Sequence, residues 1–411
     1  MNIAIWGLGV SGLSSLRFLA QKTQHKLYII NQGDVSSWIT DEILTYVSQE
    51  ACLSQDNALE LTGMLDLIVL SPGIDPRQEI FQNFLEVETI CEVELAFRYL
   101  KKDAKYIALT GTNGKTTTVT LITKALEAAG KNVFLGGNIG TPLCEALLLD
   151  EEFDFYVLEL SSFQISLLKD FHPQIAIVLN ITKSHMERYD SIQEYIDAKL
   201  ALGNNLTTND LWIAPSEYIN TSSSATKKEI QMISGYSFEH SILVGNHYKL
   251  NFFVVEQVLN FFDLDSQKII QNLINTFSGV KYRLEYLGEF KGAKIYNDAK
   301  STNTSSTYSA ISAFKDKKVA CLLGGKLRDL SQNLKELECD DVDFYGFGEA
   351  KDFISTQLKC IIADTLSSLI LELDFEKYDV VVFSPAFPSF DQYKNYVERG
   401  KDFENLIQKL I

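Results

Sequence analysis

A short glycine-rich loop between an apolar run and a helical stretch constrains the fold of this chain most strongly. The loop GTNGKTT spans residues 111–117; YIALT precedes it and TVTLITKALEAAG follows it. A buried strand, a phosphate-binding loop and a helix in this order are typical of an α/β nucleotide-binding domain. The spacing is shorter than usual, because the expected first glycine is replaced by Leu109 and Gly111 lies three residues before Gly114.

The residue types in this loop predict an ATP site. Backbone N–H groups and the helix N-terminus can hold phosphate, Lys115 adds a point charge, and the Thr116 hydroxyl can bind magnesium. The predicted ATP contacts from the loop are Gly111, Thr112, Asn113, Gly114, Lys115, Thr116 and Thr117.

Polar residues also follow the next two apolar strands. Glu159 stands near the end of the run FYVLE, and His185 follows the run QIAIVLN. A buried carboxylate is costly unless it is paired or bound to a metal. Taken alone, Glu159 fits a structural and a functional role equally well. Since ligands of open α/β sheets bind beyond the carboxyl ends of the strands, we predict that His185 is functional, although a lone histidine is more often structural.

A second glycine turn opens the chain, where Gly7, Gly9 and Gly12 form G-x-G-x-x-G between a predicted strand and a helix. Dinucleotide enzymes usually carry an acidic residue at the end of the next strand. Here that strand ends at Asn31 and Gln32, which weakens the case for an oxidoreductase. A nucleotide other than a dinucleotide is favoured, and close strand–helix packing is the structural alternative.

Strands alternate with helices along most of the chain, which indicates parallel sheets. We predict an α/β protein of three domains with boundaries near residues 93 and 280: 1–93, 94–280 and 281–411. Residues 86–102 are expected to form a helix that closes the first domain. The polar tract 218–229 is expected to be an exposed loop, with a low-complexity interaction segment as the alternative.

Composition excludes several functional classes. The 411 residues are 46% hydrophobic, as in globular proteins, and carry a net charge of −17, which disfavours binding to nucleic acid or anionic membranes. The six cysteines are widely spaced and none forms C-x-x-C, so reduced thiols are expected. No apolar run reaches the length of a membrane span, and we expect a soluble cytoplasmic protein.

Motifs along nearly the whole chain resemble those of the Mur ligases. The matching segments are TGTNGKTT, GGNIG, LELSSFQ, NITKSHMERY, YIDAK, NDAKSTN, LLGG and SPAFPSFDQYKNYVERG. The resemblance implies a Rossmann-like UDP-binding domain, a central P-loop-type ATPase domain and a Rossmann-like C-terminal domain. The GLGVSG opening and the C-terminal segment are most similar to members that join D-glutamate to UDP-N-acetylmuramoyl-L-alanine, through an acyl phosphate, in peptidoglycan precursor synthesis.

The resemblance also implies metal and catalytic roles. Lys115 would contact the ATP phosphates, and Thr116 with Glu159 would hold one Mg²⁺ ion. His185 and Lys199 would serve a second Mg²⁺ ion. In the family the matching lysine is carbamylated, which turns a cation that cannot coordinate a metal into an oxygen donor. Without the resemblance, Lys199 would be interpreted as a solvated helix lysine.

Further ligand contacts follow from the same resemblance. The implied ATP contacts outside the loop are Asn251, Arg283, Asp298 and Lys300. The implied contacts of the UDP-linked substrate are Gly9, Val10, Ser11, Asn31, Gln32, Ser71, Gly73 and Asn138. The implied contacts of D-glutamate are Thr302, Arg328, Ser389 and Tyr396. A monomer is expected.

The chain departs from the family pattern at several positions, which puts details of metal, adenine and amine binding in doubt. The departures are Ser184 before the histidine, Tyr248 in place of asparagine, Tyr282 before Arg283, Ala299 in NDAK and the aromatic Phe387. An aromatic Tyr248 could stack on adenine where an amide would donate a hydrogen bond.

Three alternative functions make different demands on the residues. A nicotinamide oxidoreductase would use only the first 35 residues or so. A regulatory nucleotide-binding module would explain both glycine loops but would not require His185 or Lys199. A folylpolyglutamate-type ligase would share the GTNGKTT loop but would not need a UDP-binding domain.

Overall fold

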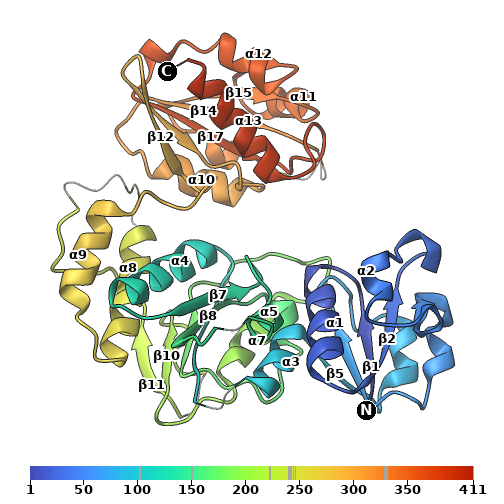
Figure 1. Cartoon of the computed structure of the whole chain (residues 1–411). Helices are drawn as coiled ribbons and strands as arrows, with labels where there is room; N and C mark the ends of the chain where they lie inside the picture. Colours follow the sequence, from blue (N-terminus) through green and yellow to red (C-terminus); the bar gives the residue numbers. More distant parts are fainter. Residues whose placement is uncertain are drawn as a thin grey trace. The chain divides into compact units, whose positions relative to one another are not determined.

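The computed structural model of the chain describes residues 1–100, 103–149, 151–221, 224–238, 243, 245, 247–327 and 332–410. The chain folds into two compact units (Figure 1). The first unit comprises Met1–Gln231 and Val254–Ser266, and the second comprises Met232–Phe253 and Gln267–Ile411. In the described residues the strands form three sheets, two in the first unit and one in the second.

The first sheet is parallel and has the strand order β3-β2-β1-β4-β5. Its strands are β1 (Asn2–Trp6), β2 (Lys26–Asn31), β3 (Cys52–Ser54), β4 (Leu67–Leu70) and β5 (Glu88–Ile90). The associated helices are α1 (Val10–Lys22), α2 (Asp41–Leu44) and α3 (Glu92–Tyr99). Strands β1, β2 and β4 are almost wholly apolar and buried, as expected for a sheet covered on both faces.

The second sheet is also parallel and has the order β11-β10-β9-β6-β8-β7. Its strands are β6 (Lys105–Thr110), β7 (Val133–Gly137), β8 (Phe155–Glu159), β9 (Ile175–Val178), β10 (Leu211–Ala214) and β11 (Thr226–Glu229). Its helices are α4 (Lys115–Ala128), α5 (Leu143–Ala146), α6 (Ser162–Ile165) and α7 (Ile192–Leu200). One continuous apolar core includes buried residues of both sheets of the first unit.

The third sheet has the order β12-β13-β17-β14-β15-β16 and is parallel except for the pair β12–β13. Its strands are β12 (Glu285–Phe290), β13 (Ala293–Asn297), β14 (Val319–Gly324), β15 (Val342–Phe347), β16 (Cys360–Ala363) and β17 (Val380–Ala386). Its helices are α10 (Thr304–Ser312), α11 (Lys351–Gln357), α12 (Leu366–Leu371) and α13 (Tyr396–Gln408), while α8 (His247–Phe261) and α9 (Ser266–Thr276) precede the sheet in sequence. Buried side chains of these strands contribute to two apolar clusters, which have no residue in common.

Short 3-10 helices connect several of these elements, at Val35–Ser37, Gln49–Ala51, Gln55–Leu61, Glu79–Phe84, Ala201–Gly203, Lys335–Leu337 and Phe375–Lys377. Within the described ranges, no helix combines the length and the apolar character needed to cross a membrane.

Two local predictions were wrong. Residues 86–102 were expected to be one helix. Of these, 101 and 102 lie outside the described residues; among the described ones, residues 88–90 form β5 and only Glu92–Tyr99 is helical. Strand β5 exists because Glu88, Thr89 and Ile90 pair with the edge of β4, a contact that local propensity does not reveal. In the polar tract 218–229, residues 226–229 form the exposed edge strand β11 rather than a loop.

The three sheets lie within the three predicted segments, whose exact boundaries remain predictions. Strands β1–β5 fall within residues 1–93, β6–β11 within 94–280 and β12–β17 within 281–411.

Candidate active site

The GTNGKTT loop joins β6 to α4 and is held by the end of β9. Thr112 N donates to Asn180 O at 2.9 Å, Asn113 N donates to Asn180 Oδ1 at 2.9 Å, and Asn180 Nδ2 donates to Asn113 O at 3.0 Å. Gly114 has φ 82° and precedes the first turn of α4, a backbone conformation that glycine adopts without strain. The neighbouring strand therefore fixes the loop below the N-terminus of a long helix, the usual geometry for binding phosphate.

The Lys115 ammonium lies over this loop. Its Nζ donates to Gly111 O at 2.9 Å and to Thr112 O at 3.1 Å. Charged phosphate oxygens are stronger acceptors than neutral carbonyls, so these contacts leave the ammonium where it can turn to a bound phosphate.

Glu159 ends β8 and is only 2% exposed. Its Oε2 accepts a hydrogen bond from Thr116 Oγ1 at 2.7 Å, and its Oε1 accepts one from Asn138 Nδ2 at 3.1 Å. The carboxylate thus joins the first turn of α4 to the loop after β7. The predicted pair Thr116 and Glu159 is brought into direct contact.

These two oxygen-bearing side chains suit Mg²⁺, which prefers hard oxygen ligands and keeps several waters. In the part of the chain that is described, no group of three or more His, Cys, Asp or Glu side chains could hold a metal alone. A magnesium ion at Thr116 and Glu159 would therefore need further oxygens from phosphate and water, as is usual at nucleotide sites.

The loop that carries Asn138 is pressed against the end of β8. Asn138 N donates to Glu159 O at 2.7 Å. Gly137 has φ 97°, and a Cβ atom at this position would lie 2.3 Å from Glu159 O. Gly136 is equally confined, since a Cβ there would lie 2.2 Å from Thr141 O. Both glycines are required for the loop to approach the strand this closely.

Lys199, near the end of α7, is 2% exposed. Its Nζ donates to Gly111 O at 3.1 Å and to Thr110 Oγ1 at 3.3 Å, and it lies 4.8 Å from the centre of the Tyr195 ring. Burial, together with a smaller effect of the positive charge of Lys115, lowers the pKa of Lys199 to about 7, and the carboxylate of Glu159 partly opposes this shift. A large fraction of the amine is therefore neutral near pH 7, which is the nucleophilic form of a lysine.

His185 lies in the segment between β9 and α7 with a left-handed backbone, φ 56°. Its ring packs edge-on against Phe163, with centroids 5.3 Å apart, and its Nδ1 lies 3.4 Å from Glu187 Oε1. A non-glycine residue in this conformation costs free energy, so the surrounding contacts must hold it there.

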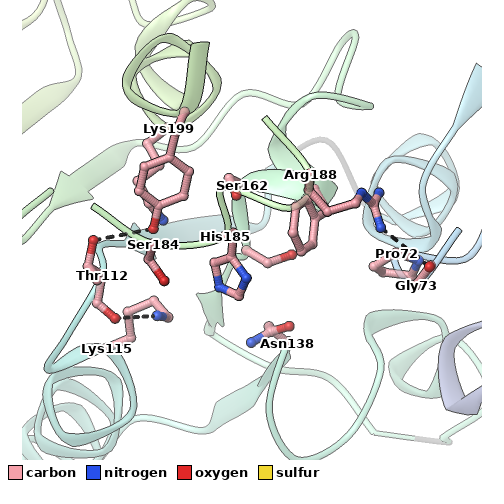
Figure 2. Close-up of a pocket in the computed structure, with 13 residues that line it drawn as sticks. Pro72, Gly73, Thr112, Lys115, Asn138, Ser162, Ser184, His185, Arg188 and Lys199 are labelled. Carbon is pink, nitrogen blue, oxygen red and sulfur yellow. Dashed lines mark hydrogen bonds between the residues drawn. The ribbon is translucent and has the colours of Figure 1, made fainter. Parts of the chain in front are cut away.

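These groups surround a pocket of about 340 Å³ in the first unit (Figure 2), called the central pocket below. Its lining residues are Pro72, Gly73, Thr112, Lys115, Asn138, Ser161, Ser162, Phe163, Ser184, His185, Arg188, Tyr195 and Lys199. The predicted catalytic residues Lys115, His185 and Lys199 thus share one pocket with Gly73 and Asn138, which the resemblance assigned to the UDP-linked substrate.

The other residues predicted for that substrate lie at the carboxyl ends of the first sheet. Ser71 Oγ donates to Gly7 O at 2.8 Å, and Leu8 N lies 3.4 Å from Asn31 Oδ1. A Cβ at Gly12 would lie 1.9 Å from Gly7 O, so close packing of α1 on the turn requires glycine there. The remaining predicted contacts are partly or fully exposed on this turn and at the end of β2: Gly9, Val10, Ser11 and Gln32.

In the second unit, Asp298 is the most constrained predicted residue. Its Oδ2 accepts from Ser301 Oγ at 2.5 Å and from Ser384 Oγ at 2.8 Å, and its Oδ1 accepts from Leu284 N at 3.1 Å. Burial raises its pKa to about 6, against these hydrogen bonds and the charge of Arg283.

The other residues of this unit that were predicted to contact ATP or D-glutamate differ in their surroundings. Lys300 Nζ lies 4.1 Å from the centre of the Tyr396 ring. A residue predicted to contact ATP is thus in contact with one predicted to contact D-glutamate. Asn251 is 5% exposed, and its Nδ2 has no hydrogen-bond partner among the described residues, as expected of a group that awaits a ligand. The other predictions are the partly buried Arg283 and Thr302 and the buried Ser389, while Arg328 lies outside the described residues.

Tyr248 and the other departures are mostly enclosed. Tyr248 is 3% exposed, Ala299 and Phe387 are fully buried, and Tyr282 is 9% exposed. Tyr248 therefore presents little ring surface for stacking on adenine.

Comparison with known proteins now defines the class. Residues 109–290 match the family described as the Mur ligase middle domain, and relatives that extend over the full chain exceed 30% identity. The chain belongs to the Mur ligase family. The resemblance inferred from the sequence motifs is thereby confirmed.

The curated relatives point to one branch of that family. The chain is 32% identical to the UDP-N-acetylmuramoylalanine--D-glutamate ligase of Petrotoga mobilis over 443 aligned positions, which cover 100% of both chains. It is also 32% identical to the ligase of the same name from Aquifex aeolicus, with 99% of each chain covered.

Solved structures support the fold. The ligase MurF of Thermotoga maritima, in complex with ADP, matches with a TM-score of 0.62 and 17% identity over 95% of this chain and 97% of that chain. MurC of Thermotoga maritima matches with a TM-score of 0.58 and 18% identity over 100% of this chain and 99% of that chain. The predicted three-part α/β fold class is confirmed.

Seven residues that line the central pocket were not among the predicted site residues: Pro72, Ser161, Ser162, Phe163, Ser184, Arg188 and Tyr195. All but Pro72 stand within the recognised motifs LELSSFQ, NITKSHMERY and YIDAK, from which only Glu159, His185 and Lys199 were carried over as site residues. The signal that could have found Arg188 is its position three residues after His185.

Proposed function

We propose that the protein is an ATP-dependent ligase that forms an amide between the alanyl carboxylate of UDP-N-acetylmuramoyl-L-alanine and the amine of D-glutamate. The observation that supports it most is the central pocket, in which Lys115 of the glycine-rich loop lies with Gly73, which follows the first sheet. The pair Thr116 and Glu159 adjoins this pocket, because Glu159 accepts a hydrogen bond from the lining residue Asn138. Full-length similarity to ligases named for this reaction supports the choice of substrates.

The chemistry requires activation of a poor acyl donor. Direct attack on a carboxylate would expel oxide, so the carboxylate oxygen first attacks the γ-phosphorus of ATP, and ADP leaves. The amine of D-glutamate then attacks the acyl carbon, and inorganic phosphate leaves. Phosphoryl transfer depends on positioning and on neutralising charge, which is the role proposed for Lys115 and the N-terminus of α4.

Magnesium would supply further neutralisation of the phosphate charge. We propose that Thr116 and Glu159 hold one ion and that His185 and carbamylated Lys199 hold a second. The buried, partly neutral amine of Lys199 is suited to react with CO₂, because only the unprotonated amine is a nucleophile.

Residues of the second unit are also proposed to bind the substrates. Asn251, Arg283, Asp298 and Lys300 are proposed to contact ATP. D-Glutamate is proposed to contact Thr302, Arg328, Ser389 and Tyr396. Under this proposal catalysis requires residues of both units. We therefore expect the reaction to include a closing motion, after which both units contact the same bound substrates.

The substrates also set where the reaction would take place. ATP and a UDP-linked precursor are metabolites of the cytoplasm, so we propose a cytoplasmic role in peptidoglycan precursor synthesis. All the proposed contacts come from one chain, so a monomer is proposed.

Phosphate release is the direct test of this function. In the presence of ATP and Mg²⁺, release should require both UDP-N-acetylmuramoyl-L-alanine and D-glutamate. L-Glutamate, L-alanine and omission of the amine are the controls. Release that is independent of the UDP-linked substrate, or equal with both glutamate enantiomers, would contradict the proposal.

The low pKa of Lys199 predicts pH-dependent modification. The free side chain has a pKa of about 10.4, whereas burial lowers that of Lys199 to about 7. Between these values the unfolded chain retains a proton that the folded chain has lost, so the Lys199 contribution to the free energy of unfolding rises with pH. The carbamate signal in ¹³C NMR with ¹³C-bicarbonate should rise from pH 6 to pH 8 and should be absent in Lys199→Ala. A signal that survives in that variant would contradict the assignment.

A further inference from the structure

A cluster of ion pairs and hydrogen bonds joins the segment after β4 to the segment before α7. Arg188 Nη1 donates to Gly73 O at 3.3 Å (Figure 2). Arg188 Nη2 donates to Ile74 O at 3.1 Å, and Nε lies 3.4 Å from Asp75 Oδ2. One guanidinium therefore holds three consecutive residues that follow the first sheet.

The same side chain also supports the opposite wall of the central pocket. Its guanidinium carbon lies 4.3 Å from the centre of the Phe163 ring, and the Phe163 ring in turn packs against His185 at 5.3 Å. The backbone connects them as well, since Arg188 N donates to His185 O at 2.9 Å. A planar guanidinium can make the in-plane hydrogen bonds and the stacking contact at the same time.

Arg77 reinforces this arrangement from the first-sheet side. It donates to Arg188 O, lies 3.1 Å from Asp75 Oδ2, and approaches Asp190 and Glu194 at 3.5 and 3.6 Å. Its side chain is 42% exposed and that of Arg188 is 19% exposed. Exposed ion pairs contribute little, so the more enclosed, charge-assisted contacts of Arg188 should dominate.

We infer that Arg188 is a positioning residue that couples the Gly73–Asp75 segment, on the side of the UDP-linked substrate, to Phe163 and His185. The inference rests on the proposed function, because it assigns the substrate side through Gly73. A substrate that settles against Gly73 would stabilise Arg188, and Arg188 would then hold His185 in its strained backbone conformation.

The test replaces Arg188 by lysine in the full-length protein. Lysine keeps the positive charge but lacks the planar fork, so it cannot contact both carbonyls, Asp75 and Phe163 together. The kcat/KM for UDP-N-acetylmuramoyl-L-alanine should fall about 10- to 100-fold, the range expected for charge-assisted hydrogen bonds. The dissociation constant of a non-hydrolysable ATP analogue, measured without the UDP-linked substrate, should change less than about twofold, since no ATP contact is lost.

Arg17→Lys is the matched control. Arg17, on α1, also joins the region of the first sheet to that of the second, through Glu42 at 2.6 Å and Glu145 at 3.3 Å, but it does not line the central pocket. Its activity should equal that of the unaltered protein. A second measurement combines Arg188→Lys with Asp75→Asn, and the two losses should be less than additive because the residues act on one segment.

The outcomes separate the inference from the proposed function. Unchanged kcat/KM in Arg188→Lys, or a fall matched by weaker binding of the ATP analogue and a lower melting temperature, would overturn the coupling role. Absence of substrate-dependent phosphate release in the unaltered protein would contradict the proposed function and the inference together. Retained release with an unaffected variant would contradict the inference alone.

Discussion

Replacement of Lys115 by alanine is expected to lower kcat for phosphate release by about 10²–10³-fold, the usual loss when one preorganised charge-stabilising group is removed. Lys115 is the cation at the phosphate loop, and its Nζ lies within 3.1 Å of the loop carbonyls of Gly111 and Thr112. Steady-state phosphate release with saturating UDP-N-acetylmuramoyl-L-alanine and D-glutamate measures the effect.

Lys124→Ala provides the control on the same helix, because Lys124 is exposed on α4 and does not line the central pocket. It should keep normal activity. Lys115→Ala should also raise the pKa of Lys199, since the charge of Lys115 now lowers it. Normal turnover by Lys115→Ala would remove the ATP role assigned to this loop.

Replacement of Lys199 by alanine is expected to lower kcat on the order of 10³-fold, because a catalytic metal supplies several kcal/mol of charge stabilisation and each 1.36 kcal/mol is a factor of ten. The buried amine lies 3.1 Å from Gly111 O, at the floor of the phosphate loop. A short carboxylate such as formate should partly restore activity, because it can occupy the space of the carbamate and offer the same oxygen ligands.

Chloride at the same ionic strength should not restore activity, and formate should not rescue Lys115→Ala, whose missing group is a cation. Metal content, measured beside activity, decides the interpretation. If formate fails to rescue while Lys199→Ala binds as much Mg²⁺ as the unaltered protein, the carbamate role is contradicted.

The sequence predicted the glycine-rich loop between β6 and α4 because its determinants are local. In GTNGKTT the glycine, lysine and threonine residues lie within one short stretch of backbone, and the apolar composition of β6, β8 and β9 identifies these segments as buried strands. The pairing of Thr116 with Glu159, 43 residues apart, was implied by the resemblance to the Mur ligases, and the two side chains are in contact in the structure.

The features that the sequence did not predict depend on tertiary contacts. Strand β5 forms only because β4 offers a free edge, and β11 forms because β10 does. Arg188 reaches Phe163 and the carbonyls of Gly73 and Ile74, which are 25, 115 and 114 positions away, and no local pattern specifies which partner a loop arginine selects. The low pKa of Lys199 likewise reflects burial that helix periodicity alone did not indicate.

The paired glycines at the end of β7 have a consequence for changing the specificity of this enzyme. Neither Gly136 nor Gly137 has room for a methyl group, since each Cβ would meet a backbone oxygen at 2.2 or 2.3 Å. In libraries that vary this wall, nearly every substitution at the two glycines should therefore be lost. A changed preference for the proposed UDP-linked substrate must therefore be sought by exchanging side chains on this wall, and not by moving the main chain that carries them.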